Sequence, residues 1–92
     1  MVNAVVLVAC EIDAIPEAAQ AIADIDGVSE VYSVAGEWDL VAVVRVAAHE
    51  DLARVIPQGL AKVDGVVRTE TLIAFQVYSR HDLESMFSVG FE

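Results

Sequence analysis

Apolar residues occupy both alternate positions in two segments of the chain, residues 2–10 and residues 39–47. Most side chains in these segments are Val, Leu or Ala, and after Asp39 at its start the second segment contains Arg45 as its only charge. A strand that is apolar on both sides is typical of a sheet covered on both faces. We therefore predict two strands here, each buried on both sides.

Two further segments have the length and pattern of strands. Residues 28–35 form an extended stretch that ends at a turn around Gly36, and residues 67–78 alternate between two faces. One face of residues 67–78 carries Val67, Thr69, Thr71, Ile73, Phe75 and Val77. The sequence thus predicts four strands.

Between the strands, the apolar period changes to that of a helix. Residues 13–24 have this spacing, with Asp13 as the expected N-cap and Pro16 in the first turn, where proline is tolerated. The stretch from residue 52 to residue 63 repeats the spacing, but Pro57 removes a backbone donor and crowds the carbonyl of Ala53. We expect the second helix to be kinked or broken at Pro57.

The phrase Asp-Gly-Val occurs twice, at residues 26–28 and 64–66, each time between a helical run and an extended one. Each glycine can adopt the positive φ found just past a helix end. The duplication predicts two halves in the order β-α-β-β-α-β, an α+β ferredoxin-like domain whose four-stranded antiparallel sheet has two helices on one face. We assign residues 1–79 to this domain and residues 80–92 to a C-terminal tail.

The other face of the predicted sheet has no helix to cover it. Apolar residues make up 57% of the chain, more than the roughly 45–50% of ordinary soluble domains. An open face of this kind would expose a large hydrophobic patch. We expect a second copy to cover it by C2 association, which gives a sheet-to-sheet dimer, a dimeric α/β barrel. The apolar residues of the tail predict that it docks on its own or a neighbouring subunit.

Charge excludes one large class of partners. Fifteen acidic residues against five scattered basic ones give a net charge of -10, which repels phosphate backbones, so direct binding to nucleic acid is not expected. No apolar run reaches the roughly 18 residues of a membrane span. A single cysteine, Cys10, fits a reducing compartment, and its neighbours Glu11 and Asp13 are expected to raise its pKa. We expect a cytoplasmic protein.

The sequence shows little that points to catalysis. His49 has no second His or Cys at ligand spacing, and no nucleophile elbow or phosphate loop is present. We therefore predict no metal, no cofactor and no catalytic residue. One enzymatic alternative is a cofactor-independent oxygenase or isomerase with Tyr32, Trp38 and His49 in a pocket between helices and sheet. Another alternative is a purely structural assembly module.

Two short motifs resemble those of a known family. The stretch from Val28 to Leu40 contains the turn Gly36-x-x-Asp39, and Val66 begins the run Val-x-x-Thr-x-Thr. Together they resemble the effector-binding domain of the Lrp/AsnC transcription regulators, called the regulation of amino-acid metabolism (RAM) domain. The resemblance covers residues 2 to about 80. Because no helix-turn-helix precedes the first strand, the chain resembles the stand-alone members, and DNA binding is not implied.

The resemblance implies a function and a set of site residues. In this family, sheet-to-sheet dimers assemble into larger rings, and a free amino acid or similar effector binds between dimers. A full-length Lrp/AsnC-type regulator is an implied partner. The implied ligand-binding residues are Gly36, Glu37, Trp38, Asp39, Thr69 and Thr71. In a partly dry site, Asp39 can accept a hydrogen bond from the ammonium, and the threonine hydroxyls can bond either end of the zwitterion.

Each of these residues also has a structural explanation. Gly36 fits the short turn that a hairpin requires, and Asp39 can hydrogen-bond the backbone of that turn. Thr69 and Thr71 are good strand residues on any account. Trp38 fits a dimer interface better than it fits a ligand pocket. The sequence leaves both explanations open.

Overall fold

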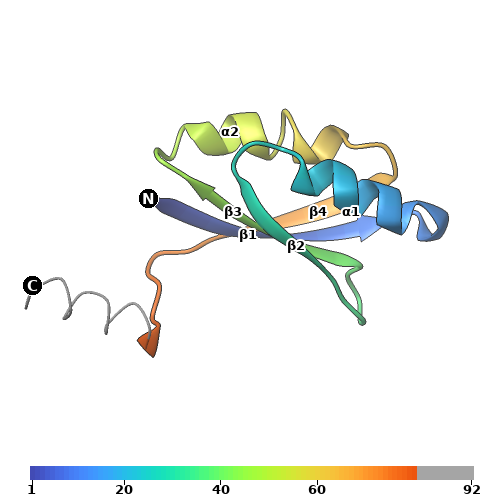
Figure 1. Ribbon diagram of the computed structural model, residues 1–92, viewed down its shortest axis with the longest axis horizontal. Helices are drawn as coiled ribbons and strands as arrows, with labels where there is room; N and C mark the ends of the chain where they lie inside the picture. The colour runs from blue at the N-terminus through green and yellow to red at the C-terminus, as the bar shows by residue number, and fades with distance from the viewer. Residues whose placement is uncertain (81–92) are drawn as a thin grey trace, which may run out of the picture.

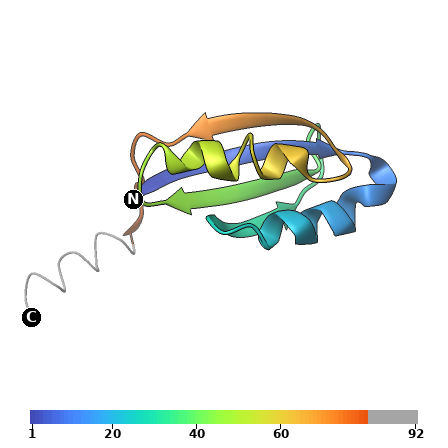
Figure 2. The same cartoon turned by 90° about the horizontal axis from the view of Figure 1, so that it is seen from above.

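A computed structural model describes residues 1–80 as one antiparallel sheet with helices on one side (Figure 1). The strands are β1 (Val2–Cys10), β2 (Val28–Ser33), β3 (Leu40–Val46) and β4 (Val66–Ile73), in the spatial order β2-β3-β1-β4. Helices α1 (Ile15–Ala23) and α2 (Asp51–Val55) both lie over the same face of the sheet (Figure 2). This arrangement confirms the predicted ferredoxin-like βαββαβ fold.

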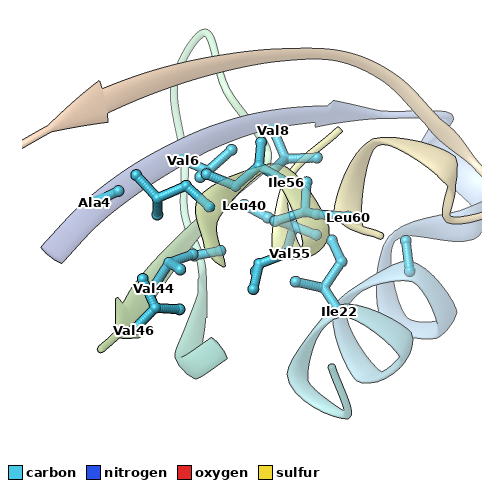
Figure 3. Packing of buried hydrophobic residues seen from close by; sticks show 13 residues of the cluster. Ala4, Val6, Val8, Ile22, Leu40, Val44, Val46, Val55, Ile56 and Leu60 are labelled. Carbon is cyan, nitrogen blue, oxygen red and sulfur yellow. The ribbon is translucent and has the colours of Figure 1, made fainter. Parts of the chain in front are cut away.

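The core lies between the sheet and the helices (Figure 3). On β1 and β3, the even-numbered side chains point towards the helices, and all of them except Val2 and Cys10 at the ends of β1 are buried. The buried cluster consists of Ala4, Val6, Val8, Ala18, Ile22, Leu40, Ala42, Val44, Val46, Leu52, Val55, Ile56 and Leu60. Every buried residue within 1–80 is apolar, so the burial of these side chains holds the helices on the sheet.

The first helix begins later than predicted, and Asp13 is not its N-cap. A 3-10 turn, η1 (Ile12–Ala14), contains Asp13, and Ala14 is the N-cap of α1 without a side-chain hydrogen bond. Pro16 lies in the first turn of α1. The fixed φ of proline suits that position, whereas its missing N–H is a defect further inside a helix. Pro16 therefore fits a helix that starts at Ile15.

The second helical region is broken, as predicted from Pro57. Helix α2 ends at Val55, and a separate 3-10 turn, η2 (Leu60–Lys62), follows. In a continuous helix, the N–H of residue 57 would donate to the carbonyl of Ala53. Proline has no N–H, and the N–H of Gln58 donates to that carbonyl instead, at 3.2 Å.

The fourth strand is shorter than predicted and ends at Ile73 rather than at residue 78. Ala4 of β1 pairs with Ile73, and the Ala74 N–H donates to the Asn3 carbonyl at 2.9 Å. Beyond that point, β1 has almost no residues left with which a longer strand could pair. Residues 81–92, most of the predicted tail, lie outside the described residues.

Both glycines of the duplicated phrase have positive φ, as predicted: 106° at Gly27 and 93° at Gly65. Gly27 also packs closely on the second helix, since a Cβ placed there would lie 2.7 Å from Cγ2 of Val55. The phrase thus marks the return from each helix to the sheet.

The face of the sheet opposite the helices, called the open face below, is uncovered in the described chain. Its apolar side chains are partly exposed: Val5, Leu7, Val41, Val43 and Leu72. The charged residues of the strands also lie on this face: Arg45, Arg68, Glu30 and Glu70. Two positive and two negative charges sum to zero, whereas the chain carries -10. Residues 1–80 hold no helix with the length and apolar character needed to cross a bilayer.

Candidate functional site

The turn between β2 and β3 is fixed at its base and exposed at its tip. The Val34 N–H donates to the Asp39 carbonyl at 3.0 Å, and the Asp39 N–H donates to the Val8 carbonyl at 2.9 Å. At the tip, Gly36 has a φ of 130° and open space where a Cβ would lie. Gly36 and Glu37 are exposed, so their backbone is accessible to an incoming group.

The Asp39 side chain forms a hydrogen bond with the backbone of its own chain. Its Oδ2 accepts a hydrogen bond of 2.8 Å from the backbone N–H of Cys10. The last pair between β1 and β3 joins Val8 to Leu40, so Cys10 lies past the end of that ladder. The carboxylate replaces the missing strand partner and ties the turn to the end of β1. This geometry supports the structural explanation of Asp39.

Asp39 also acts on the nearby thiol. Burial raises the pKa of Cys10, and the negative charge of Asp39 raises it further. The predicted direction is confirmed, but the cause differs, because Asp39 and burial take the place of Glu11 and Asp13. A neutral thiol is a weak nucleophile, so Cys10 is no candidate for covalent chemistry at neutral pH.

Trp38 lies against a cation of the open face. The Arg68 guanidinium carbon is 4.3 Å from the centroid of the Trp38 ring, within the range of a cation–π contact. Arg68 pairs with Ala9 of β1, among the residues of the open face. Trp38 therefore contacts the side of the sheet where a second copy is expected to pack.

Thr69 and Thr71 lie on the helix side of the edge strand β4, paired with Val8 and Val6 of β1. Thr71 lines a hollow of about 300 Å³ between α2 and β4, whereas Thr69 does not. The other lining residues are His49, Glu50, Leu52, Ala53, Ile56, Pro57 and Ile73. The hollow runs along α2, from His49 and Glu50 before the helix to Ile56 and Pro57 after it, beside Thr71 and Ile73 of β4.

Comparison with known proteins identifies the family. The family model described as the Lrp/AsnC ligand binding domain matches residues 3–83. The chain belongs to the Lrp/AsnC ligand-binding domain family. The crystal structure of TTHA0845 from Thermus thermophilus is 45% identical, with a TM-score of 0.82, and the match covers 87% of this chain and 100% of that one.

Longer Lrp/AsnC proteins are also similar. An HTH-type transcriptional regulator of Pyrococcus horikoshii is 44% identical over 59 residues, which are 64% of this chain and 39% of that protein. The matched part thus spans about two fifths of this regulator. The transcriptional regulator NMB0573 from Neisseria meningitidis, solved as an L-Met complex, shares the fold with a TM-score of 0.76 at 15% identity. That match covers 86% of this chain and 53% of that one.

The Lrp/AsnC motif residues do not form one pocket within a single chain. Val8 of β1 pairs with Leu40, next to the turn, on one side and with Thr69 of β4 on the other. The strand β1 therefore lies between the turn and the threonines, which are two strand spacings apart, roughly 10 Å. The turn extends past the sheet, Trp38 lies against the open face, and Thr71 lies under α2. Within the described chain, the two motifs therefore touch on the open face, through Trp38 and Arg68, but Thr69 and Thr71 point to the opposite face.

The sequence motifs missed most of the hollow. His49 stood out only as a metal or enzyme candidate, and Glu50, Ile56 and Pro57 did not stand out as pocket residues at all. Pro57 was singled out from the sequence as the residue that breaks the helix, and it also lines the hollow, since it follows the end of α2. Residues 1–80 contain no cluster of three His, Cys, Asp or Glu side chains suited to a metal ion.

The residues of the enzymatic alternative are also dispersed. Tyr32 pairs with Val41 on the open face and is 50% exposed. A hydrogen bond with Glu30, and the charge of that carboxylate, raise the pKa of Tyr32. Trp38 contacts Arg68 on the same face, whereas His49 lies at the hollow on the helix side. The three side chains do not meet in a pocket between helices and sheet.

Proposed function

We propose that this chain is an effector-sensing and oligomerisation module that binds a free amino acid or a closely related metabolite between subunits. It acts in the cytoplasm, on transcription, through a full-length regulator of the same family rather than by contacting DNA itself. It carries out no catalysis. The observation that carries the proposal is the hollow beside Thr71. Its lining offers a carboxylate, a hydroxyl and apolar side chains, which suit part of an amino-acid ligand.

The hollow is lined by both apolar and polar side chains. The apolar ones include Leu52, Ile56, Pro57 and Ile73, and the polar ones are His49, Glu50 and Thr71. The Glu50 carboxylate can accept from an ammonium group, and the Thr71 hydroxyl can bond either end of a zwitterion. The apolar lining suits an apolar side chain of the ligand. The L-Met complex of the fold relative NMB0573 supports this choice of ligand class.

The other half of the site comes from another subunit. The turn at Gly36 and Glu37 projects from the body, with nothing within 4 Å of the position of a Gly36 Cβ. Its backbone N–H groups can approach the ligand carboxylate closely, which glycine permits. Gly36, Glu37, Trp38 and Asp39 of one subunit and Thr69 and Thr71 of another form the shared site in this proposal. Ligand binding then requires a dimer or a larger ring.

The open face supports dimer formation. Val5, Leu7, Val41 and Val43 form an apolar centre on it, and the four strand charges around them cancel. In a C2 interface the same surface meets itself. A neutral face with two charges of each sign can therefore pair with its copy, whereas the acidic remainder of the chain repels one.

A thermal-shift screen of amino acids tests the effector proposal. A ligand that binds only the folded protein raises its melting temperature in proportion to the logarithm of ligand concentration. Thr71→Val keeps the shape and removes the hydroxyl, so it should reduce the shift. Ser29→Ala removes an exposed hydroxyl from β2 on the far edge of the sheet and should leave the shift intact. A screen without any shift at millimolar ligand would refute effector binding and favour the structural assembly module.

A further inference from the structure

The segment after β4, residues 74–79, is called the arm here. The Ala74 N–H donates to the Asn3 carbonyl at 2.9 Å, which is the last bond of the ladder. From there the chain leaves the sheet on the side away from α1 and α2 (orange in Figure 1). The arm therefore extends past the open face, next to the start of β1.

The arm presents apolar side chains that are exposed to solvent, two of them almost completely. Phe75 is 104% exposed, Tyr78 88% and Val77 52%. Isolated exposed apolar residues are common, but three within four positions form a patch of the kind found at interfaces. Residues 71–79 also contain no charge. A neutral segment can approach a second copy of an acidic chain without repulsion.

A groove of about 510 Å³ lies between the far end of the arm and the start of the sheet. Its lining residues are Met1, Asn3, Arg45, Val77 and Ser79. Asn3 and Arg45 are paired neighbours on the open face. Within residues 1–80, the Asn3 Oδ1 is buried and accepts no hydrogen bond. A buried acceptor without a donor is destabilising, so the Asn3 side chain lowers the stability of the chain at this groove.

We propose that the arm packs on the partner subunit of the dimer, with Phe75, Val77 and Tyr78 against a second copy seated on the open face. The inference rests on the open-face dimer of the proposed function. Twofold symmetry makes the contact reciprocal, because each arm then holds the opposite subunit. The arm is thus a second interface element, separate from the sheet.

Photo-crosslinking of the full chain tests the arm directly. Phe75 is replaced by p-benzoylphenylalanine, and chains of normal and heavy isotope composition are mixed before irradiation. The proposal predicts crosslinks between light and heavy chains that map to residues around the open face. A stable dimer whose crosslinks all lie within one chain would overturn the arm proposal and leave the dimer standing. A wild-type chain that sediments as a monomer would overturn both.

Substitution supplies a second, independent readout. Phe75→Ser combined with Tyr78→Ser should raise the dimer dissociation constant at least about tenfold in sedimentation, because both apolar contacts are lost. Ile12→Ser is the matched control: Ile12 is 89% exposed and lies past the other end of β1. It should leave dissociation unchanged. Circular dichroism of each variant checks that the fold is retained, and equal effects of the two substitutions would contradict the proposal.

Discussion

The backbone N–H of Cys10 donates to Oδ2 of Asp39 at 2.8 Å, across 29 positions of sequence. Asp39→Ala leaves that partly buried N–H unpaired, so we expect a loss of about 1–3 kcal/mol in the free energy of unfolding. Urea denaturation measures it. Glu37→Ala, at an exposed neighbour in the same turn, should change stability by no more than about 0.5 kcal/mol. Equal effects of the two substitutions would show that the bond contributes nothing.

This bond affects how ligand tests are designed. Asp39→Ala removes both a possible ligand contact and the hydrogen bond that holds the turn. If the ligand no longer raised the melting temperature of this variant, either loss could be the cause. Asp39→Asn keeps an acceptor oxygen for the Cys10 N–H and removes the charge. We expect Asp39→Asn to retain most of the stability, so a reduced effector shift in that variant would reflect the lost charge. The measurement pairs urea denaturation with the thermal-shift screen.

The pH dependence of Cys10 follows from the raised pKa of its thiol. Burial is the larger cause and the Asp39 charge the smaller. Asp39→Asn should therefore lower the Cys10 pKa without returning it to the ordinary value of 9.0. The pH profile of iodoacetamide alkylation measures this pKa. A profile identical in wild type and Asp39→Asn would contradict the electrostatic contribution.

The same shift has a consequence for stability. A folded-state pKa above the unfolded one means that the native state holds the proton more tightly. The stabilising contribution of the Cys10 thiol is fully present at pH values below its pKa in the unfolded state. It is lost as the pH rises through the higher pKa of the thiol in the folded state. Wild type should therefore lose stability in alkali more steeply than Cys10→Ser. Parallel curves above the ordinary thiol pKa would rule this out.

Gly27 and Gly36 should respond differently to alanine. Both have positive φ, and such strain costs on the order of 1–3 kcal/mol. At Gly27 the new Cβ would also lie 2.7 Å from Val55 Cγ2, whereas at Gly36 it meets nothing within 4 Å. Overpacking adds about 1–3 kcal/mol at Gly27. Urea denaturation should therefore show the larger loss for Gly27→Ala, and the opposite order would contradict the described packing.

The contact between Trp38 and Arg68 can be measured by a double-mutant cycle. We expect a coupling of about 0.5–1 kcal/mol between Trp38→Leu and Arg68→Gln, the range for an exposed cation–π pair. Trp38 is the only tryptophan, so its fluorescence should also change in Arg68→Gln. Additive effects of the two substitutions would show that the guanidinium does not stabilise the ring.

Local patterns predicted much of the fold. The order of strands and helices along the chain, the glycines with positive φ and the break at Pro57 all depend on residues close together in sequence. The end of β4 was predicted wrongly because it depends on the length of β1, which pairs with it from the other end of the chain. Helix α1 begins later than predicted because Asp13 lies in a 3-10 turn that precedes the helix.

The candidate site was less accessible to sequence reasoning. Asp39 was recognisable as a functional or turn-forming residue, but its bond to Cys10 depends on where the β1 and β3 ladder stops. The hollow beside Thr71 is a space between α2 and β4, and no periodicity in either segment reports such a space. Shared sites raise the same difficulty, since half of the contacts come from another molecule.

The distribution of charge has a consequence for solution behaviour. The strands carry two charges of each sign on the open face, whereas ten acidic residues lie in the helices and loops of the described chain. Like charges repel, so two molecules that meet by their acidic surfaces gain nothing, whereas the neutral face permits the close approach that the proposed dimer requires. Added salt screens this repulsion. Less selective association at high salt is therefore the expected behaviour of a chain whose charge distribution favours one face for pairing.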